Sequence, residues 1–166
     1  MNVVLIGYRG TGKSTVGKIV AARLVRELLS TDTEIVRLAG QPISQIVEQH
    51  GWEYFRDLES KICQDLASKD GVVIDTGGGA ILRPQNVEVL KRTGRLFWLT
   101  ASVEVIAKRI GSDTQRPSLT GTKSFVDEIQ DVLRERLPQY QAAADETIET
   151  GGKSVTQVAD EILTRR

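Results

Sequence analysis

Residues 7–14 of this 166-residue chain read Gly-Tyr-Arg-Gly-Thr-Gly-Lys-Ser and have the spacing of a phosphate-binding loop, here called the P-loop. Its glycines allow the tight turn that aims backbone N–H groups at a phosphate chain. Lys13 can reach the β- and γ-phosphates, and the Ser14 hydroxyl can bind Mg²⁺. An apolar run precedes the loop and a helical pattern follows it, so the helix dipole adds to the attraction for an anion. The residues predicted to bind Mg·ATP are Gly10, Thr11, Gly12, Lys13, Ser14 and Thr15.

Two later stretches place polar or flexible residues directly after predicted strands. Asp32 follows a short extended piece at residues 29–31, and Asp75 ends the apolar run at residues 72–74. Three glycines, Gly77, Gly78 and Gly79, come next and are here called the glycine loop. Ligands of open parallel sheets bind at the carboxyl ends of the strands, and glycines there let a substrate approach the backbone. Asp32 could instead be a helix cap, since Thr31 or Asp32 precedes a helix.

The elements that must position these residues alternate between strands and helices. This alternation favours an α/β fold with a parallel sheet covered by helices on both faces. The expected strands are residues 3–6, 29–31, 72–74, 96–99 and 147–150. The expected helices are residues 15–29, 33–38, 43–50, 52–68, 84–93, 103–110, 125–136 and 154–165. Pro138 is expected to limit the seventh helix, and residues 111–123 read as a mobile loop because they are poor in apolar residues.

Composition excludes several classes of protein. Hydrophobic residues make up 40% of a chain of one-domain length, which indicates a folded domain. Lys plus Arg equals Asp plus Glu at 22 each, so nothing points to nucleic acid or to an anionic membrane. One cysteine permits no internal disulfide, and the N-terminal apolar run is too short for a signal peptide or a membrane span. We expect a cytoplasmic monomer.

Behind the P-loop, five further motifs together resemble those of the shikimate kinase family. They are Thr-Asp-Thr-Glu-Ile from residue 31, Phe-Arg-Asp-Leu-Glu from residue 55, Gly-Gly-Gly-Ala from residue 77, Arg-Pro-Ser-Leu from residue 116, and Arg136 with Pro138 and Tyr140. The resemblance implies a P-loop kinase core with a five-stranded parallel sheet in a single domain covering residues 1–166. Residues 33–60 would be a helical substrate-binding insert, and residues 111–123 a mobile lid.

The resemblance also implies the reaction and the role of each residue. The γ-phosphoryl group of ATP would pass to the 3-hydroxyl of shikimate, with no covalent enzyme intermediate. The shikimate carboxylate would be gripped by Arg56 and Arg136, whose guanidinium groups can pair with it bidentately. Asp32 would orient the attacking hydroxyl and accept its proton. The glycine loop would contact shikimate. On the nucleotide side, Arg116 would contact the ATP phosphates, and Arg109 and Lys153 would lie beside the adenine.

One position departs from the pattern of the family. The family usually has Asp-x-Asp before the Glu-Ile pair, and here Ser30 replaces the first Asp, which ordinarily helps to hold Mg²⁺. Losing a carboxylate should weaken a site for a hard cation. Asp75 ends the neighbouring predicted strand, where the family tends to have a small polar or apolar residue. In the family the first Asp acts on Mg²⁺ through water, and the hypothesis is that Asp75 takes over this water-mediated role, which Ser30 cannot fill.

Two alternatives remain open from the sequence. The chain could be a P-loop kinase for another small molecule, such as gluconate or a nucleoside monophosphate. It could also be a weakened homologue that binds shikimate without phosphorylating it, because of Ser30.

Overall fold

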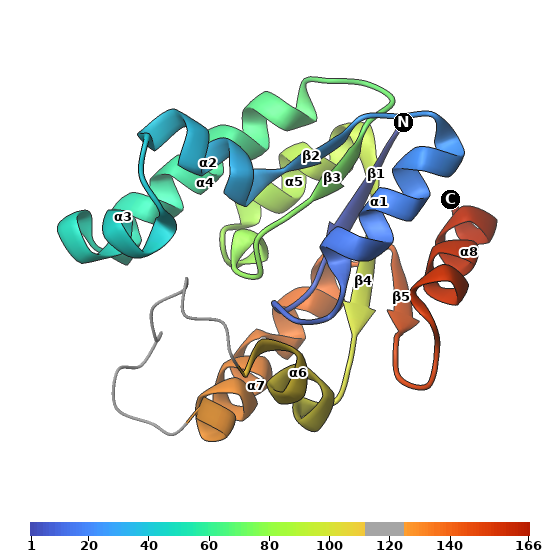
Figure 1. Ribbon diagram of the computed structural model, residues 1–166. Helices are drawn as coiled ribbons and strands as arrows, with labels where there is room; N and C mark the ends of the chain where they lie inside the picture. The colour runs from blue at the N-terminus through green and yellow to red at the C-terminus, as the bar shows by residue number, and fades with distance from the viewer. Residues whose placement is uncertain (112–124) are drawn as a thin grey trace.

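The computed structural model describes residues 1–111 and 125–166, and its centre is a sheet of five strands that all pair in parallel (Figure 1). The strand order is β2-β3-β1-β4-β5. The strands are β1 (Asn2–Ile6), β2 (Leu28–Ser30), β3 (Val73–Asp75), β4 (Gly94–Thr100) and β5 (Glu146–Glu149). The five-stranded parallel sheet expected from the sequence is therefore confirmed.

Helices connect these strands, as parallel pairing requires. They are α1 (Lys13–Leu24), α2 (Thr31–Ala39), α3 (Ile43–His50), α4 (Trp52–Ala67), α5 (Pro84–Thr93), α6 (Val103–Ile110), α7 (Phe125–Ala143) and α8 (Val155–Arg165), together with the 3₁₀ turn η1 (Ala80–Leu82). In the part of the chain that the structure describes, no helix has the length and apolar composition needed to cross a membrane.

The sheet is buried on both faces, and successive residues of β1 alternate between them. Val3 and Leu5 pack in a core with α1 and α8, whereas Val4 and Ile6 pack in a second core with residues of α2, α4, α5 and α7. Such alternation follows from the two-residue period of a strand. Both faces are apolar because helices cover both, which explains the continuous apolar runs of the sequence. The result is a three-layer structure.

The helices α2, α3 and the start of α4 form a lobe to one side of the sheet (Figure 1). Gly40 ends α2 in the left-handed conformation with φ 70°, and Pro42 precedes the first residue of α3. Ile35, Ile46 and Phe55 are fully buried and join this lobe to the larger core. The lobe coincides with the segment that the sequence singles out as an insert.

Two helix ends differ from the sequence-based expectation. The first helix stops at Leu24 rather than near residue 29, because Val25 adopts the left-handed conformation with φ 54° and ends it. The predicted start of α2 at residue 33 was also wrong. The N-cap of α2 is Ser30, whose hydroxyl accepts a hydrogen bond from the Thr33 N–H at 3.3 Å. Asp32 therefore lies in the first turn of α2 and is not the cap.

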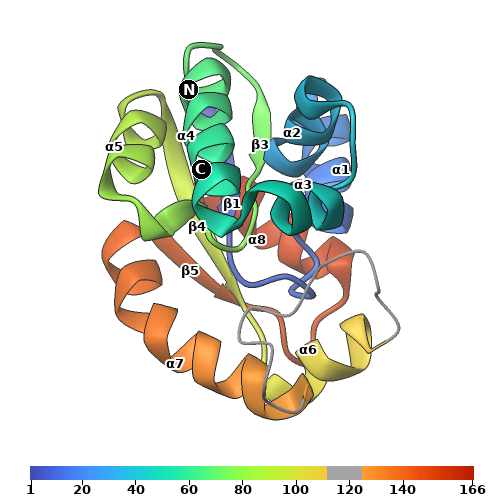
Figure 2. The same ribbon diagram turned by 90° about the vertical axis from the view of Figure 1, so that its left-hand side faces the viewer.

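The helix α7 does not stop before Pro138, as the sequence suggested, but runs through it to Ala143. A proline inside a helix loses one hydrogen bond and costs about 3 kcal/mol. Here the residues beyond it compensate, because Tyr140 and Ala143 are buried in the larger core. Figure 2 shows α7 as a long helix that runs along one side of the molecule from α6 to the connection with β5.

Candidate active site

The P-loop joins the end of β1 to the start of α1, and three of its glycines adopt positive φ angles. These are Gly7 (146°), Gly10 (81°) and Gly12 (90°). A Cβ atom on Gly7 would lie 2.6 Å from the Leu99 carbonyl oxygen, and one on Gly10 would lie 2.7 Å from a methyl carbon of Ile110. Both conformation and space therefore require glycine at these two positions. The turn predicted from the motif is present.

The side chains of Lys13 and Thr11 donate hydrogen bonds to backbone carbonyl groups of the P-loop. The Lys13 ammonium donates to the carbonyl oxygens of Gly7 at 2.7 Å and Tyr8 at 3.0 Å, and the side chain is buried. The Thr11 hydroxyl also donates to the Tyr8 carbonyl, at 2.8 Å. The ammonium group thus sits inside the loop, where a phosphate chain would meet it at the N-terminus of α1.

The two residues expected beside the adenine lie in different settings. Arg109, near the end of α6, donates a hydrogen bond to the Gly10 carbonyl at 3.1 Å, so its guanidinium lies against the P-loop. Lys153 lies in the turn after β5 and pairs with Glu161 of α8 at 2.5 Å. The structure thus brings Arg109 to the nucleotide side, and it directs the Lys153 side chain to α8.

Asp75 and Ser14 meet where β3 ends beside the P-loop. The Ser14 hydroxyl donates to Asp75 Oδ2 at 2.6 Å, and Asp75 is 6% exposed. In the pairing of β2 with β3, Ser30 and Asp75 are direct partners, so the residue that replaces the usual Asp lies next to the added carboxylate. No group of three or more His, Cys, Asp or Glu residues suited to a metal occurs in residues 1–111 and 125–166. A metal here would therefore also need phosphate and water oxygens.

One cavity of about 390 Å³ connects the P-loop to the glycine loop. Its lining includes Lys13 and Ser14 of the P-loop, Asp75 at the end of β3, and Asp32 with the first two glycines of the glycine loop. A phosphate chain on the P-loop and an acceptor beside Asp32 would thus share one space.

Charged side chains from three helices converge on the glycine loop. A Cβ atom on Gly77 would lie 2.8 Å from Asp32 Oδ1 and from Glu59 Oε2, and one on Gly79 would overlap the guanidinium of Arg56. These charged groups come from α2 and α4. From α7, Arg136 Nη1 would lie 3.5 Å from a Cβ on Gly78. At 77 and 79 these side chains occupy the space that a Cβ would fill, so a larger residue there would displace the charged groups of the site.

Arg56 and Arg136 are both held in place by aromatic or acidic neighbours. Arg56 Nη1 pairs with Glu59 Oε1 at 2.9 Å, and its guanidinium lies 5.4 Å from the ring of Trp52. Arg136 is only 7% exposed, and its guanidinium carbon lies 5.9 Å from the ring of Tyr8. Two oriented guanidinium groups at one loop form a site suited to a carboxylate. We call these two residues the acid clamp.

Glu59 belongs to this site, although sequence reasoning quoted it only as part of a motif and gave it no role. It is 1% exposed, and burial raises the pKa of its carboxyl, an effect that Arg56 opposes first and Arg136 to a smaller extent. Its spacing of three residues from Arg56 on one helix was the signal that could have identified the pair. The pair fixes the direction of the Arg56 guanidinium.

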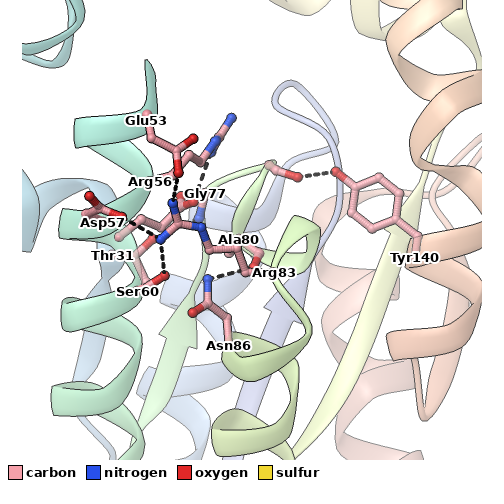
Figure 3. A network of polar contacts seen from close by, with 12 residues as sticks. Thr31, Glu53, Arg56, Asp57, Ser60, Gly77, Ala80, Arg83, Asn86 and Tyr140 are labelled. Carbon is pink, nitrogen blue, oxygen red and sulfur yellow. Dashed lines mark hydrogen bonds and ion pairs between the residues drawn. The ribbon is translucent and has the colours of Figure 1, made fainter. Parts of the chain in front are cut away.

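The backbone of the glycine loop is also anchored by two residues that the sequence analysis did not assign to the site. The Thr31 hydroxyl accepts a hydrogen bond from the Gly77 N–H at 2.8 Å, and the Tyr140 hydroxyl donates to the Gly78 carbonyl (Figure 3). Tyr140 also stacks on Trp98, with ring centroids 5.5 Å apart. Burial raises the pKa of Tyr140 to about 12, so its hydroxyl keeps its proton at neutral pH. Arg116, predicted to contact ATP, lies outside the described residues.

A family model of shikimate kinase matches residues 9–165, which is most of the chain. The chain belongs to the shikimate kinase family. It is 41% identical to the shikimate kinase of Syntrophus aciditrophicus over 99% of this chain and 90% of that protein. It is 43% identical to the shikimate kinase of Nitratidesulfovibrio vulgaris over 96% of this chain and 92% of that protein.

A solved structure agrees with these relatives in both fold and family. The shikimate kinase from Acinetobacter baumannii in complex with shikimate superposes with a TM-score of 0.94. The two are 37% identical, and the match covers 99% of this chain and 91% of that one. The P-loop kinase architecture inferred from the sequence is therefore confirmed.

Proposed function

We propose that this chain transfers the γ-phosphoryl group of ATP to the 3-hydroxyl of shikimate, giving shikimate 3-phosphate and ADP in the synthesis of chorismate and aromatic amino acids. As a member of its family, it is an ATP-dependent shikimate kinase. The observation that best supports the roles given below is the single cavity that joins the P-loop to Asp32 and the glycine loop.

On the nucleotide side, we assign phosphate binding to the backbone N–H groups of residues 10–15 and to the Lys13 ammonium. In the structure this ammonium is bound to two carbonyl oxygens of its own loop. It would exchange those contacts for the β- and γ-phosphates, where its charge stabilises the transferring group. Arg109, already against Gly10, and the backbone at Lys153 would flank the adenine.

Mg²⁺ is the metal that this reaction needs, and the residues present fit it. Ser14 and Asp75 offer a hydroxyl and a buried carboxylate 2.6 Å apart at the edge of the cavity, and Mg²⁺ prefers oxygen ligands of this kind. When bound, the ion would neutralise charge on the β- and γ-phosphates. The Ser30 hydroxyl accepts a hydrogen bond as the cap of α2, and Asp75 is the direct partner of Ser30 in the sheet, which supports Asp75 as the replacement for the missing carboxylate.

Metal binding tests this assignment directly. Mn²⁺ titrated into the ADP-loaded protein and followed by electron paramagnetic resonance should bind about tenfold more weakly to Asp75→Asn, because a negative charge beside the metal site is lost. The Mg²⁺ dependence of turnover should shift in parallel. The double variant Ser30→Asp, Asp75→Ser restores the usual arrangement of the family and should recover Mn²⁺ affinity. Unchanged affinity in Asp75→Asn would reject the role.

On the acceptor side, we assign the shikimate carboxylate to the acid clamp and the ring to the glycine loop. Asp32 lines the shared cavity and can accept the proton of the 3-hydroxyl as its oxygen bonds to the γ-phosphorus. The bond from phosphorus to the β-bridging oxygen breaks at the same time, and ADP leaves in line. No residue needs to form a covalent intermediate.

Three further assignments rest on the resemblance to the family. Residues 33–60 would act as the substrate-binding insert. Residues 111–123 would act as a lid that brings Arg116 to the phosphates and excludes water. The protein would be a cytoplasmic monomer, with small molecules rather than nucleic acid as partners.

An ADP-release assay across four acceptors tests the reaction. Shikimate should support turnover with Mg·ATP, whereas quinate, gluconate and AMP should support little. Release with gluconate or AMP instead would point to a kinase of another specificity. Binding of shikimate with no ADP release would indicate a homologue that has lost catalysis.

A further inference from the structure

Arg83 lies four residues after the glycine loop, at the N-cap position of α5, but its side chain does not cap that helix. It points instead to α4 (Figure 3). Its guanidinium donates to Asp57 Oδ1 at 2.8 Å, to Glu53 Oε1 at 2.8 Å and to the Ser60 hydroxyl at 3.2 Å. One side chain therefore binds residues along two turns of α4.

The three partners of Arg83 occupy one stripe of α4, and the residues of the substrate site occupy another. Residues 53, 57 and 60 follow one another at intervals of four and three, which places them on one face of a helix. Arg56 and Glu59, on a neighbouring stripe, lie against the glycine loop. Whatever fixes α4 at the first stripe therefore also fixes the position of Arg56, the member of the acid clamp that α4 carries.

The connection from Arg83 back to the glycine loop is short and rigid. Only the 3₁₀ turn η1 lies between them, and the Asn86 side chain donates to the Ala80 carbonyl at 3.0 Å. Pro84 restricts the chain on the other side, at the first position of α5. Arg83 is thus attached firmly to the segment that faces substrate.

The Arg56 guanidinium lies directly against the glycine loop. A single added carbon on Gly79 would overlap the Arg56 guanidinium. A small shift of α4 would therefore change where that guanidinium can meet a carboxylate, and misplacement on the scale of 1 Å is costly for a binding group.

We propose that Arg83 is a positioning residue for the shikimate site: it ties α4 to the glycine loop and so sets the distance between Arg56 and the loop. This proposal rests on the proposed function, since it takes shikimate as the ligand of that site. Arg83 does not line the cavity that contains the P-loop residues, so its effect should be confined to the acceptor side.

The test compares Arg83→Ala with the unaltered enzyme in steady-state kinetics. The KM for shikimate should rise about three- to tenfold, the scale of two ion pairs whose acidic partners, Glu53 and Asp57, are 88% and 67% exposed. The KM for ATP should change less than twofold. Calorimetric affinity for shikimate should fall by the same factor as the KM rises.

Two further variants separate positioning from general stability. Arg83→Lys keeps the charge but cannot hold Glu53 and Asp57 at once, so it should recover only part of the loss. Arg92→Ala, which removes the exposed pair with Glu88 on the same helix, is the matched control and should leave both KM values unchanged. A purely structural role would lower the melting temperature of Arg83→Ala without altering either KM.

The outcomes also distinguish this inference from the proposed function. If the unaltered protein neither binds nor phosphorylates shikimate, the function itself fails. If it does both and Arg83→Ala has an unchanged KM for shikimate, or equal changes for shikimate and ATP, the positioning role is wrong.

Discussion

The two halves of the site are built in different ways. The nucleotide half is one continuous stretch between β1 and α1, and its contacts are mainly backbone groups shaped by glycine. The acceptor half is assembled from α2, α4, the glycine loop and α7, and its contacts are mainly charged side chains. A local loop needs few supports. An assembled pocket needs a second layer of residues, here Glu59, Thr31, Tyr140 and, in our proposal, Arg83.

The largest effect should come from the nucleotide half, through loss of charge on the transferring group. Lys13→Ala should lower kcat about 10³-fold, the cost of removing one strong transition-state donor. Calorimetric binding of shikimate should remain, since the acid clamp is intact. Lys18→Ala, an exposed change on α1, is the control. Loss of shikimate binding in Lys13→Ala would show that the two halves are not separable.

The acid clamp should give the opposite pattern. Arg136→Ala should raise the KM for shikimate roughly 10- to 100-fold, because a charged partner of the carboxylate is lost. The KM for ATP should change little. The exposed Arg134 on the same helix provides the control substitution to Ala. Equal effects on both KM values would count against the clamp.

Substitution of Glu59, which pairs with Arg56, should have a smaller effect and a characteristic pH dependence. Glu59→Gln should raise the KM for shikimate about tenfold at most, because a charge-assisted hydrogen bond is weakened. Burial raises the Glu59 pKa above its ordinary value of 4.5, so the fold favours the protonated carboxyl. The stability that the protonated Glu59 carboxyl contributes is fully present below pH 4.5 and is lost as pH rises through the pKa of the folded state.

The substitution by Gln removes this titration. The melting temperature of Glu59→Gln should therefore rise relative to the unaltered protein between pH 4 and pH 7. Thermal melts of both proteins across that range measure the difference. If the melting temperature of Glu59→Gln instead falls relative to that of the unaltered protein as pH rises, pairing with Arg56, and not burial, determines the pKa of Glu59.

The anchor on the glycine loop should have the smallest effect. Tyr140→Phe removes the hydrogen bond to the Gly78 carbonyl and should cost about 1 kcal/mol of unfolding free energy and a few-fold in shikimate KM. The raised pKa of about 12 means that this contribution persists below pH 10 and is lost as pH approaches 12. Urea titrations at pH 7 and pH 9 should thus give equal differences; unequal ones would argue that the hydroxyl has another role.

The same contrast explains what could be predicted from the sequence. The P-loop and the alternation of strands and helices are local patterns, and both were predicted correctly. The end of α1 was missed because Val25, a β-branched residue, adopts a left-handed conformation that such residues rarely take. The length of α7 was missed because burial of Tyr140 outweighs the cost of Pro138. These are effects of tertiary packing.

In the acceptor half, Asp32 and the glycine loop stood out by their place at strand ends, but the sequence identified Arg56 and Arg136 only through a family resemblance. Arg56 and Arg136 lie 80 positions apart, and no local pattern links them. The Tyr140 bond to Gly78 and the Thr31 bond to Gly77 join distant segments, so only the folded chain reveals these supports. Ser30 as the cap of α2 was missed because Thr31 and Asp32 are equally good capping types.

Calorimetric titration of shikimate into the nucleotide-loaded protein tests the central claim most directly, namely that the acid clamp binds a carboxylate at the glycine loop, part of which lines the same cavity as the P-loop. The account predicts one binding event per chain, with an affinity for shikimate that falls roughly 10- to 100-fold in Arg136→Ala and is kept in Lys13→Ala. An absence of heat with the unaltered protein, or an unchanged affinity in Arg136→Ala, would contradict it.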